Sequence, residues 1–520
     1  MLELADRLSL PARIVGSGIL GFCFLWFAVT TFHWPLVGDA SLMHYVAFLM
    51  NHGRFPYRDV AEINMPGAFL TDDAVMHTLG PGSLAWRLFD LLLIVAATAA
   101  MVAIARPNDW FAGLFSGVLL GLLHGRDGIF DMGQRDFVVA VLILVAYTAL
   151  FRATRRGSPQ WMFVFGLGAG MATSIKPPFL LLAPAVLIFL LIARPTKARP
   201  QLAFILYASA GFVLPLVAIC VWLWHAHALH SLVFVTSGLV RYHASLARRP
   251  LSYLLIHSIS PLLPLVVLWL LVAFFQQEGW PAWERMTLVL GAAIGLLSFV
   301  VQGKGYPYQR YPFLAFLLLL MGLDFTAAAR KRGLPRMAGV AGLAFGILFV
   351  APASARIASR YDWRNTDFVT FLRQDLNRLG GPKLSGRVQC LDTNGGCYNA
   401  LYDSRLIQST GFLYDEFLFG PERNGVVAAS RKEFWNSVQA HPPAVFIVVN
   451  NLFPVGPPGF GKLALWPQFD SYLQANYLIY DTVSPPPPRW WNRQNHRRGY
   501  RIYLIRAQSP PSLSKDGSQH

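Results

Sequence analysis

The chain has 520 residues, of which 54% are apolar and 14% charged, and its formal net charge is +17. Soluble globular proteins carry about 25% charged residues, so this composition excludes a chain that is exposed to water over its whole surface. The basic residues lie mostly between apolar runs and near the C-terminus. Lipid phosphate and membrane topology explain that placement, and nucleic acid is not expected as a partner.

Apolar runs long enough to cross a bilayer, about 20 residues each, follow one another through residues 1–355. The first run, at 13–33, is too long for a signal-peptide core and is expected to be retained. The others lie near 83–105, 110–124, 134–151, 161–175, 179–193, 201–224, 251–275, 286–302, 312–328 and 337–355. Residues 1–355 are therefore predicted to form an all-α polytopic membrane domain with about eleven spans.

Basic connectors between these spans predict the orientation of the chain. Clusters of Lys and Arg at 152–156, 194–199 and 330–336 occupy alternate loops. Because such clusters favour the cytoplasmic side, the N-terminus is predicted to be cytoplasmic. The long loop 34–82 and everything after about 356 are then predicted to be extracytoplasmic.

From residue 356 onward the composition changes to that of a water-soluble domain. Short β-like runs appear at 387–391, 444–449, 477–482 and 500–506, with helix-like stretches at 364–379 and 430–440. This pattern predicts a small soluble α/β domain over 356–506. The proline run 485–488 is predicted to be a stiff connector, and 507–520 a disordered tail.

Two of the four cysteines lie in this exported domain. Cys390 and Cys397 would face an oxidising compartment, which favours a disulfide between them; two buried free thiols are the alternative. Cys23 and Cys220 lie in apolar runs and are predicted to be small core residues.

The loop 34–82 begins with a candidate catalytic acid. Asp39 follows the first span by a few residues. After it, the apolar residues from Leu42 to Leu49 recur at helical spacing, which predicts an amphipathic helix at the membrane surface. An acid held there suits chemistry between a lipid head group and a second substrate. Alternatively, Asp39 serves only to cap this helix.

A second group of acids lies between the third and fourth predicted spans. It consists of Asp127, Asp131 and Asp136. Charged groups between apolar spans are costly unless they are paired or solvated, which makes the loop a candidate site. An ordinary ion pair such as Arg135–Asp131 is the alternative.

Cations gather on the same predicted side of the membrane, although positive charge is disfavoured in short outer loops. They are Arg126, Arg135, Lys176, Lys304 and Arg310. Their common placement indicates an anionic ligand, most simply a phosphate. Snorkelling anchors are the alternative. No cofactor is predicted. His225, His227 and His230 do not share a helix face, so their spacing does not indicate a metal site. The outer carboxylates could still hold a divalent ion, although the sequence does not show one.

These residues resemble a known family. Asp39, the Gly-x-x-Pro-Tyr-x-Asp turn at 53–59 and the Asn-x-Pro at 64–66 resemble the start of the GT-C membrane glycosyltransferases. The nearest branch is the bacterial relatives of protein O-mannosyltransferases and of the lipid A aminoarabinose transferase, in glycosyltransferase family 39. The stretch 304–312 is similar to their late outer loop, and the resemblance covers roughly 15–355.

The resemblance implies an inverting glycosyltransferase that moves a sugar from a polyprenyl-phosphate donor to an envelope glycan, lipid or protein on the outer face of the membrane. Asp39 would be the general base. Asp136 would match the second acidic motif, with Asp127 or Asp131 as alternatives.

The same resemblance implies roles for the cations and for neighbouring polar residues. Lys304 and Arg310, with Lys176 and Arg126, would stabilise the leaving polyprenyl phosphate. The residues expected to line the substrate pocket are Tyr57, Asn64, Tyr308, Gln309 and Asp131. Asn64 stands in a motif that is Lys-Pro-Pro in many members, and Gln309 stands where many have His. Both departures leave the donor and any metal requirement open.

Two other classes of function compete with this one. A transporter or flippase of a lipid-linked envelope saccharide would place ionisable groups near mid-bilayer. Here the notable charges gather at one face, and few, such as His257 and Asp324, lie deep. A non-catalytic envelope assembly protein is the third possibility, against which the cluster around Asp39 argues.

Overall fold

The computed structural model describes residues 2–193, 202–274, 282–360, 367–393, 396–484 and 499–506. The basic cluster 194–199, the proline run 485–488 and the tail 507–520 lie outside the described residues, so the predictions for them are not addressed. The chain divides into two compact units. The helical unit comprises Met1–Leu36, Asn64–His225 and Ala247–Trp363, and the sheet unit comprises Val37–Ile63, Ala226–Leu246 and Arg364–His520.

The helical unit is built from helices, most of which are apolar. They are α1 (Leu2–Thr31), α3 (Pro66–Thr78), α4 (Ser83–Asp127), α5 (Arg135–Arg156), α6 (Gln160–Ile175), α7 (Leu182–Ala193), α8 (Leu202–His225), α11 (Leu251–Ile259), α12 (Leu263–Phe274), α13 (Ala282–Gln302), α14 (Tyr311–Ala329) and α15 (Leu334–Arg360). Among the described residues, 8 helices are long and apolar enough to cross a membrane. In the described part of the chain, every apolar run predicted from the sequence is helical. Helix α4 covers two of these runs, and α6 and α7 are too short to be among the eight long helices.

Helix α4 holds two predicted spans because it bends sharply at Asp109. Pro107 lacks a backbone N–H, and Asp109 leaves the helical region with φ −161° and ψ 103°. The Asp109 carboxylate then accepts a hydrogen bond from the backbone N–H of Phe111 at 3.0 Å, as a helix cap does. The second half packs back against the first through Gly113 and Gly117, where a Cβ would overlap the backbone at Met101 and Thr98.

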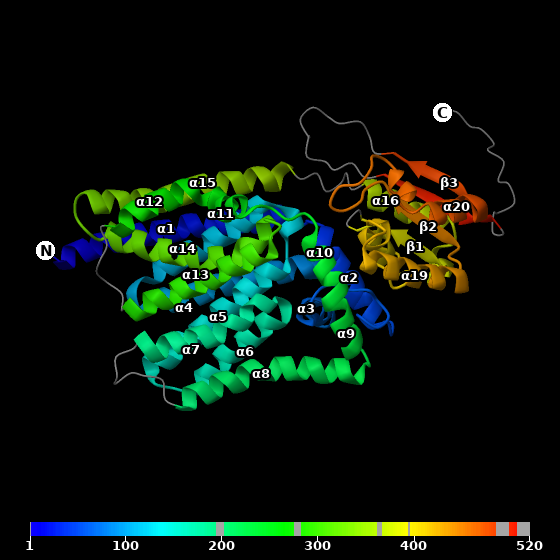
Figure 1. The fold of residues 1–520 in the computed structure, drawn as a ribbon. Helices are drawn as coiled ribbons and strands as arrows, with labels where there is room; N and C mark the ends of the chain where they lie inside the picture. Colours follow the sequence, from blue (N-terminus) through cyan, green and yellow to red (C-terminus); the bar gives the residue numbers. More distant parts are fainter. Residues whose placement is uncertain are drawn as a thin grey trace, which may run out of the picture. The chain divides into compact units, whose positions relative to one another are not determined.

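Helices α5 and α14 form the centre of the helical unit. In the 18-residue apolar segments of Arg135–Arg156 and Pro307–Ala329, 78% and 83% of the segment is buried inside the protein, compared with 17% for Leu10–Thr31. Helix α14 contacts α4, α5, α13 and α15, and α8 runs alongside α6 (Figure 1). The polar groups at the N-terminal ends of α5 and α14 are therefore held by the most buried helices of the unit.

The sheet unit contains a four-stranded mixed sheet. Its strands are β1 (Val388–Leu391), β2 (Val445–Val449), β3 (Tyr477–Val483) and β4 (Tyr500–Ile505), in the order β1-β2-β4-β3. β1 and β2 are parallel, whereas β4 is antiparallel to both β2 and β3. All four predicted β-runs are strands, which confirms the small α/β part of the predicted fold class. Beside the strands lie α16 (Asp367–Arg378), α19 (Gly425–Ala440) and α20 (Pro467–Asn476) (Figure 1).

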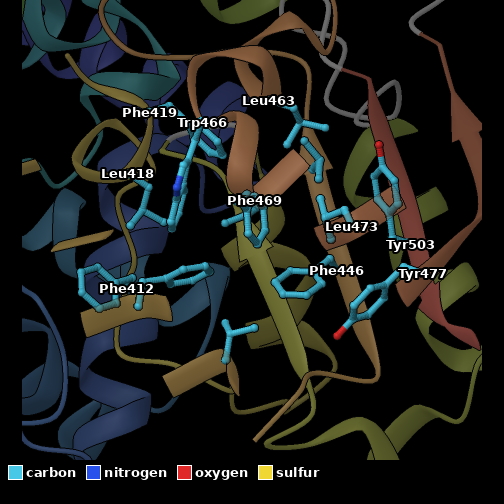
Figure 2. Packing of buried hydrophobic residues seen from close by; sticks show 14 residues of the cluster. Phe412, Leu418, Phe419, Phe446, Leu463, Trp466, Phe469, Leu473, Tyr477 and Tyr503 are labelled. Carbon is cyan, nitrogen blue, oxygen red and sulfur yellow. The ribbon is translucent and has the colours of Figure 1, made fainter. Parts of the chain in front are cut away.

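Aromatic side chains hold α19 and α20 against the sheet. Phe446 of β2 packs against Phe469 and Tyr477, with ring centroids 5.5 and 5.1 Å apart (Figure 2). Phe434 of α19 lies 5.9 Å from Trp466. Full burial of one such side chain contributes about 1.5–3 kcal/mol, so this cluster is a principal source of stability for the unit.

Helix α2 (Gly38–Met50) belongs to the sheet unit and is buried on all sides. The predicted helix is present, but its side chains are buried from Ala40 to Leu49, so it does not present one polar face. The Tyr45 hydroxyl donates to the Leu406 carbonyl at 3.0 Å and accepts from the Gln408 N–H at 2.9 Å. Helix α17 (Cys397–Asp403) packs against α2. This contact explains why the face of α2 that was predicted to be polar is also buried.

A disulfide joins Cys390 of β1 to Cys397 at the start of α17. Their Cα atoms are 6.2 Å apart, within the usual range for such bonds. The bond ties the helix that covers α2 to the sheet. We expect mass mapping without reductant to find the two cysteines in one linked peptide pair, and the Cys390→Ala, Cys397→Ala double variant to lose about 2–3 kcal/mol of unfolding free energy. Recovery of both thiols in free form would contradict this.

Candidate functional site

The predicted site residues are divided between the two units. Asp39 and Tyr57 lie in the sheet unit, whereas the other predicted catalytic, phosphate-binding and pocket residues lie in the helical unit. Within the helical unit, two buried clusters form around Asp136 and Asp127.

The first cluster surrounds Asp136, in the first turn of α5. Its carboxylate is fully buried. Lys176 Nζ lies 3.0 Å from one carboxylate oxygen, and the Gln302 side-chain amide donates to the other at 3.2 Å. Lys176 also donates to Gln302 Oε1 at 2.8 Å. The predicted acid and lysine are thus brought together, with a glutamine that the sequence analysis missed because it is an uncharged residue at the end of an apolar run.

The second cluster surrounds Asp127, at the end of α4. Arg310 Nη2 donates to its Oδ1 at 2.6 Å, and the Tyr311 hydroxyl donates to its Oδ2 at 3.1 Å. Arg310 also donates to the His257 carbonyl at 3.2 Å. Side chains of Arg310 and Asp127 are only 8% and 7% exposed, so each charge depends on the other. These hydrogen bonds fix the orientation of the Arg310 guanidinium and leave it little rotational freedom.

A chain of buried polar groups continues from Tyr311 into the helical unit. The Tyr311 hydroxyl lies 3.0 Å from His124 Nδ1, and His124 Nε2 lies 2.9 Å from Asp90 Oδ1. Asp90 also accepts from the Gly133 N–H at 2.7 Å and pairs with Arg87. Sequence analysis missed Arg87 and Asp90, although opposite charges three residues apart inside an apolar run indicate a buried helix pair.

The remaining predicted residues of the helical unit are engaged locally. Arg126 donates to the Pro261 carbonyl at 2.8 Å and lies over the Phe349 ring. Arg135 donates to the Asn64 side chain. Asp131 is buried in the short 3₁₀ helix η1 (Ile129–Asp131) between α4 and α5.

The predicted late outer loop folds into the short 3₁₀ helix η6 (Pro307–Arg310) before α14. Lys304 precedes it and is buried, as is Gln309. The Gln309 side chain accepts from the Tyr306 N–H at 3.2 Å, and the rings of Tyr306 and Tyr308 lie 5.7 Å apart. This turn holds Arg310 at the start of α14, where it meets Asp127.

In the sheet unit, Asp39 lies in the first turn of α2. The helix begins at Gly38 after an N-cap at Val37, so Asp39 is not the N-cap residue. A carboxylate in a first turn still interacts favourably with the helix dipole. Tyr57 is buried and has φ +69°, a left-handed conformation that costs about 1–2 kcal/mol for a residue with a Cβ. The Asp59 carboxylate stabilises this turn by accepting from the Phe55 N–H at 2.8 Å.

The polar clusters do not resemble a metal centre. In the described part of the chain, no set of three or more His, Cys, Asp or Glu side chains is arranged to hold a metal ion. The clusters of the helical unit are instead carboxylates paired with Lys or Arg. In such a pair, the Lys or Arg can also form charge-assisted hydrogen bonds to an anion that binds beside it.

Comparison with solved structures identifies the fold. ArnT from Cupriavidus metallidurans, bound to undecaprenyl phosphate, matches with a TM-score of 0.60 over 95% of this chain and 98% of its own, at 12% identity. The chain has the fold of the GT-C glycosyltransferases. The Archaeoglobus fulgidus oligosaccharyltransferase matches at a TM-score of 0.50 and 11% identity, over 92% of this chain and 75% of its own. Mycobacterial arabinofuranosyltransferase AftD also matches at 0.50 and 12% identity, over 94% of this chain and 41% of its own.

A family model gives an independent result for part of the chain. The model described as dolichyl-phosphate-mannose-protein mannosyltransferase matches residues 66–224. This region includes Asp90, His124, Asp127, Asp136 and Lys176. No curated protein matches the sequence. The resemblance to GT-C glycosyltransferases seen in the sequence is confirmed, and with its apolar helices the chain is an integral membrane protein.

Proposed function

We propose that this protein is an inverting glycosyltransferase that transfers a sugar from a polyprenyl-phosphate donor to an envelope acceptor. The observation that carries the proposal is the pair of buried cation–carboxylate clusters, Arg310–Asp127 and Lys176–Asp136, in a GT-C fold. ArnT, which shares this fold, was solved with undecaprenyl phosphate bound. The proposed donor therefore carries a phosphate that preorganised cations are suited to receive.

The proposed reaction breaks the bond between the anomeric carbon and the phosphate oxygen. The acceptor hydroxyl attacks that carbon from the opposite side, which inverts its configuration, and the hydroxyl proton passes to Asp39. Negative charge develops on the leaving polyprenyl phosphate. Arg310, Lys304 and Lys176 stabilise that charge, because cations already fixed in place need little reorganisation during the reaction. Asp127 and Asp136 hold two of these cations in position.

The proposal is tested with the purified full-length protein and a polyprenyl-phosphate sugar labelled in the sugar. We expect the label to move covalently to envelope glycan, lipid or protein extracted from cells that lack the gene, with release of polyprenyl phosphate. A transporter moves its lipid-linked cargo without forming such a product. Intact donor after incubation with every acceptor fraction would refute the proposed reaction.

We further propose that the reaction takes place on the outer face of a bacterial inner membrane. The N-terminus would then be cytoplasmic, and Asp39 and the disulfide-bonded domain extracytoplasmic. We expect an Asp39→Cys variant, in a background with Cys23→Ser and Cys220→Ser, to react in whole cells with a membrane-impermeant thiol reagent. The same residue labelled only after the membrane is permeabilised would contradict the proposed orientation.

A further inference from the structure

The sheet unit contains a groove whose walls come from segments far apart in the sequence. Its volume is about 1010 Å³, and most of its lining residues come from the segments 54–61, 230–239, 409–412 and 425–441. Small-molecule sites usually measure about 300–1,000 Å³. The groove is therefore large enough for an extended ligand, and none of the clustered residues of the helical unit lines it.

One wall is a polar face of α19. Ser430, Glu433 and Ser437 line the groove at helical spacing, together with Asn436. An adjacent face of α19 carries Phe434 and Val438, which belong to the buried core cluster drawn in Figure 2. The core fixes the position of the helix, so its hydroxyl, amide and carboxylate groups are presented to the groove on a rigid support.

The facing wall is formed by α9 (Leu229–Val235) and the π-helical turn η4 (Thr236–Val240). His230, Phe234 and Ser237 line the groove, and Phe234 is 59% exposed. Single π-helical turns often occur at functional sites. The following helix α10 (Arg241–Ser245) is fastened to the same unit, because His243 Nδ1 lies 2.9 Å from the Glu416 carboxylate. This wall is thus held in place while its polar and aromatic groups stay accessible.

The charges of the lining balance. Arg58 pairs with Asp59 at 2.7 Å. Although partial burial raises the pKa of Asp59, hydrogen bonds from Arg58 and from the Phe55 N–H outweigh it and hold this pKa below its ordinary value. The pair therefore carries no net charge at neutral pH, and the other two charged lining residues, Arg54 and Glu433, are opposite in sign. Such a lining does not select an anion such as a lipid phosphate.

We propose that this groove binds the acceptor as a neutral oligosaccharide. Sugar hydroxyls both donate and accept hydrogen bonds, which suits a lining of hydroxyl, amide, imidazole and balanced charged groups. The exposed Phe234 ring offers an apolar surface to the C–H face of a sugar ring. None of the lining residues belongs to the strands β1–β4, so the groove does not offer an edge of this sheet to a peptide main chain. The ligand's role as acceptor rests on the proposed function, whereas saccharide binding itself does not require catalysis.

Two adjacent alanines of α19 provide a matched pair of variants. Ala429 lines the groove, whereas Ala428 is exposed on the same helix and does not line it. A tryptophan at position 429 would occupy the groove, and one at position 428 would not. Both positions are exposed, so neither substitution overpacks the core.

The test measures binding of a panel of neutral linear oligosaccharides and matched acidic oligosaccharides to the full-length protein in detergent. We expect at least one neutral oligosaccharide to bind wild type and Ala428→Trp with equal Kd, and Ala429→Trp to bind it about tenfold or more weakly. Equal binding by Ala429→Trp, binding of acidic members alone, competition by a peptide instead of a saccharide, or no binding by any member would overturn the proposal.

Measurement of donor binding distinguishes failure of this inference from failure of the proposed function. Because the groove lining carries no net charge, we expect Ala429→Trp to bind the polyprenyl-phosphate sugar like wild type and to show a raised KM for the acceptor alone. If the protein proved not to transfer sugar, saccharide binding in the groove would still be measured. A loss of donor binding in Ala429→Trp would assign the groove to the donor and contradict the inference.

Discussion

Asp39→Asn is expected to lower the rate of sugar transfer by about 10²–10⁴-fold, the usual contribution of a positioned general base. Asparagine has nearly the same shape but cannot accept the proton of the attacking hydroxyl. Asp39 lies in the first turn of α2 and is not its N-cap, so the loss of its charge costs about 0.3–1 kcal/mol of helix stability.

The measurement is the initial rate of label transfer at saturating donor, together with thermal unfolding of the same preparation. Asp73→Asn is the matched control, because Asp73 lies on a helix of the other unit, where it pairs with the exposed His77. We expect that variant to keep wild-type activity. If Asp39→Asn transferred sugar at the wild-type rate while remaining folded, another group would have to be the base.

The extent of correct prediction differed between elements and contacts. The spans and strands could be predicted, because long apolar runs and β-like runs are local properties of the sequence. Helix α2 was also predicted, but its burial was not, because α17, which covers it, lies more than three hundred residues further along the chain. The spacing of apolar residues indicates which face is buried and cannot indicate that a distant segment buries the other face as well.

The candidate site shows the same limit. Lys176 and Asp136 were predicted to share one side of the membrane, and the structure pairs them. Gln302 completes that cluster from 166 residues away; it stands just before the predicted late outer loop, but an uncharged side chain there does not indicate this contact. His124 ends the apolar run predicted at 110–124, but its connection to Asp90 depends on how the two halves of α4 pack together. The types of side chain could be predicted; their partners required the fold.

The residues that have roles in the proposals are divided between the two units. The proposed base, Asp39, and the proposed acceptor groove belong to the sheet unit, and the turn at 54–61 that lines the groove follows α2 directly. The proposed phosphate-binding cations belong to the helical unit. We expect substitutions in the groove to change the kinetics of the acceptor, and substitutions of the phosphate-binding cations to change the kinetics of the donor.

Asp90→Asn is expected to destabilise the helical unit by about 3–5 kcal/mol, because it leaves a buried arginine without its counter-charge. Arg87 and Asp90 are both fully buried, and Asp90 also accepts from Gly133 and contacts His124. Asparagine keeps one oxygen for Gly133 and His124, but it removes the charge and places an NH2 donor opposite the Arg87 donor. The measurement is unfolding of the full-length protein in detergent, followed by intrinsic tryptophan fluorescence.

Two further variants separate charge pairing from a general effect of substitution. The double variant Arg87→Met, Asp90→Asn removes both charges and should regain part of the lost stability, because no buried charge is then left unpaired. Glu422→Gln should change stability by less than about 0.5 kcal/mol, since the Glu422 side chain is 85% exposed. If Asp90→Asn unfolded like wild type, Arg87 would not depend on Asp90, and the polar chain from Arg310 through His124 would not require this carboxylate as its end.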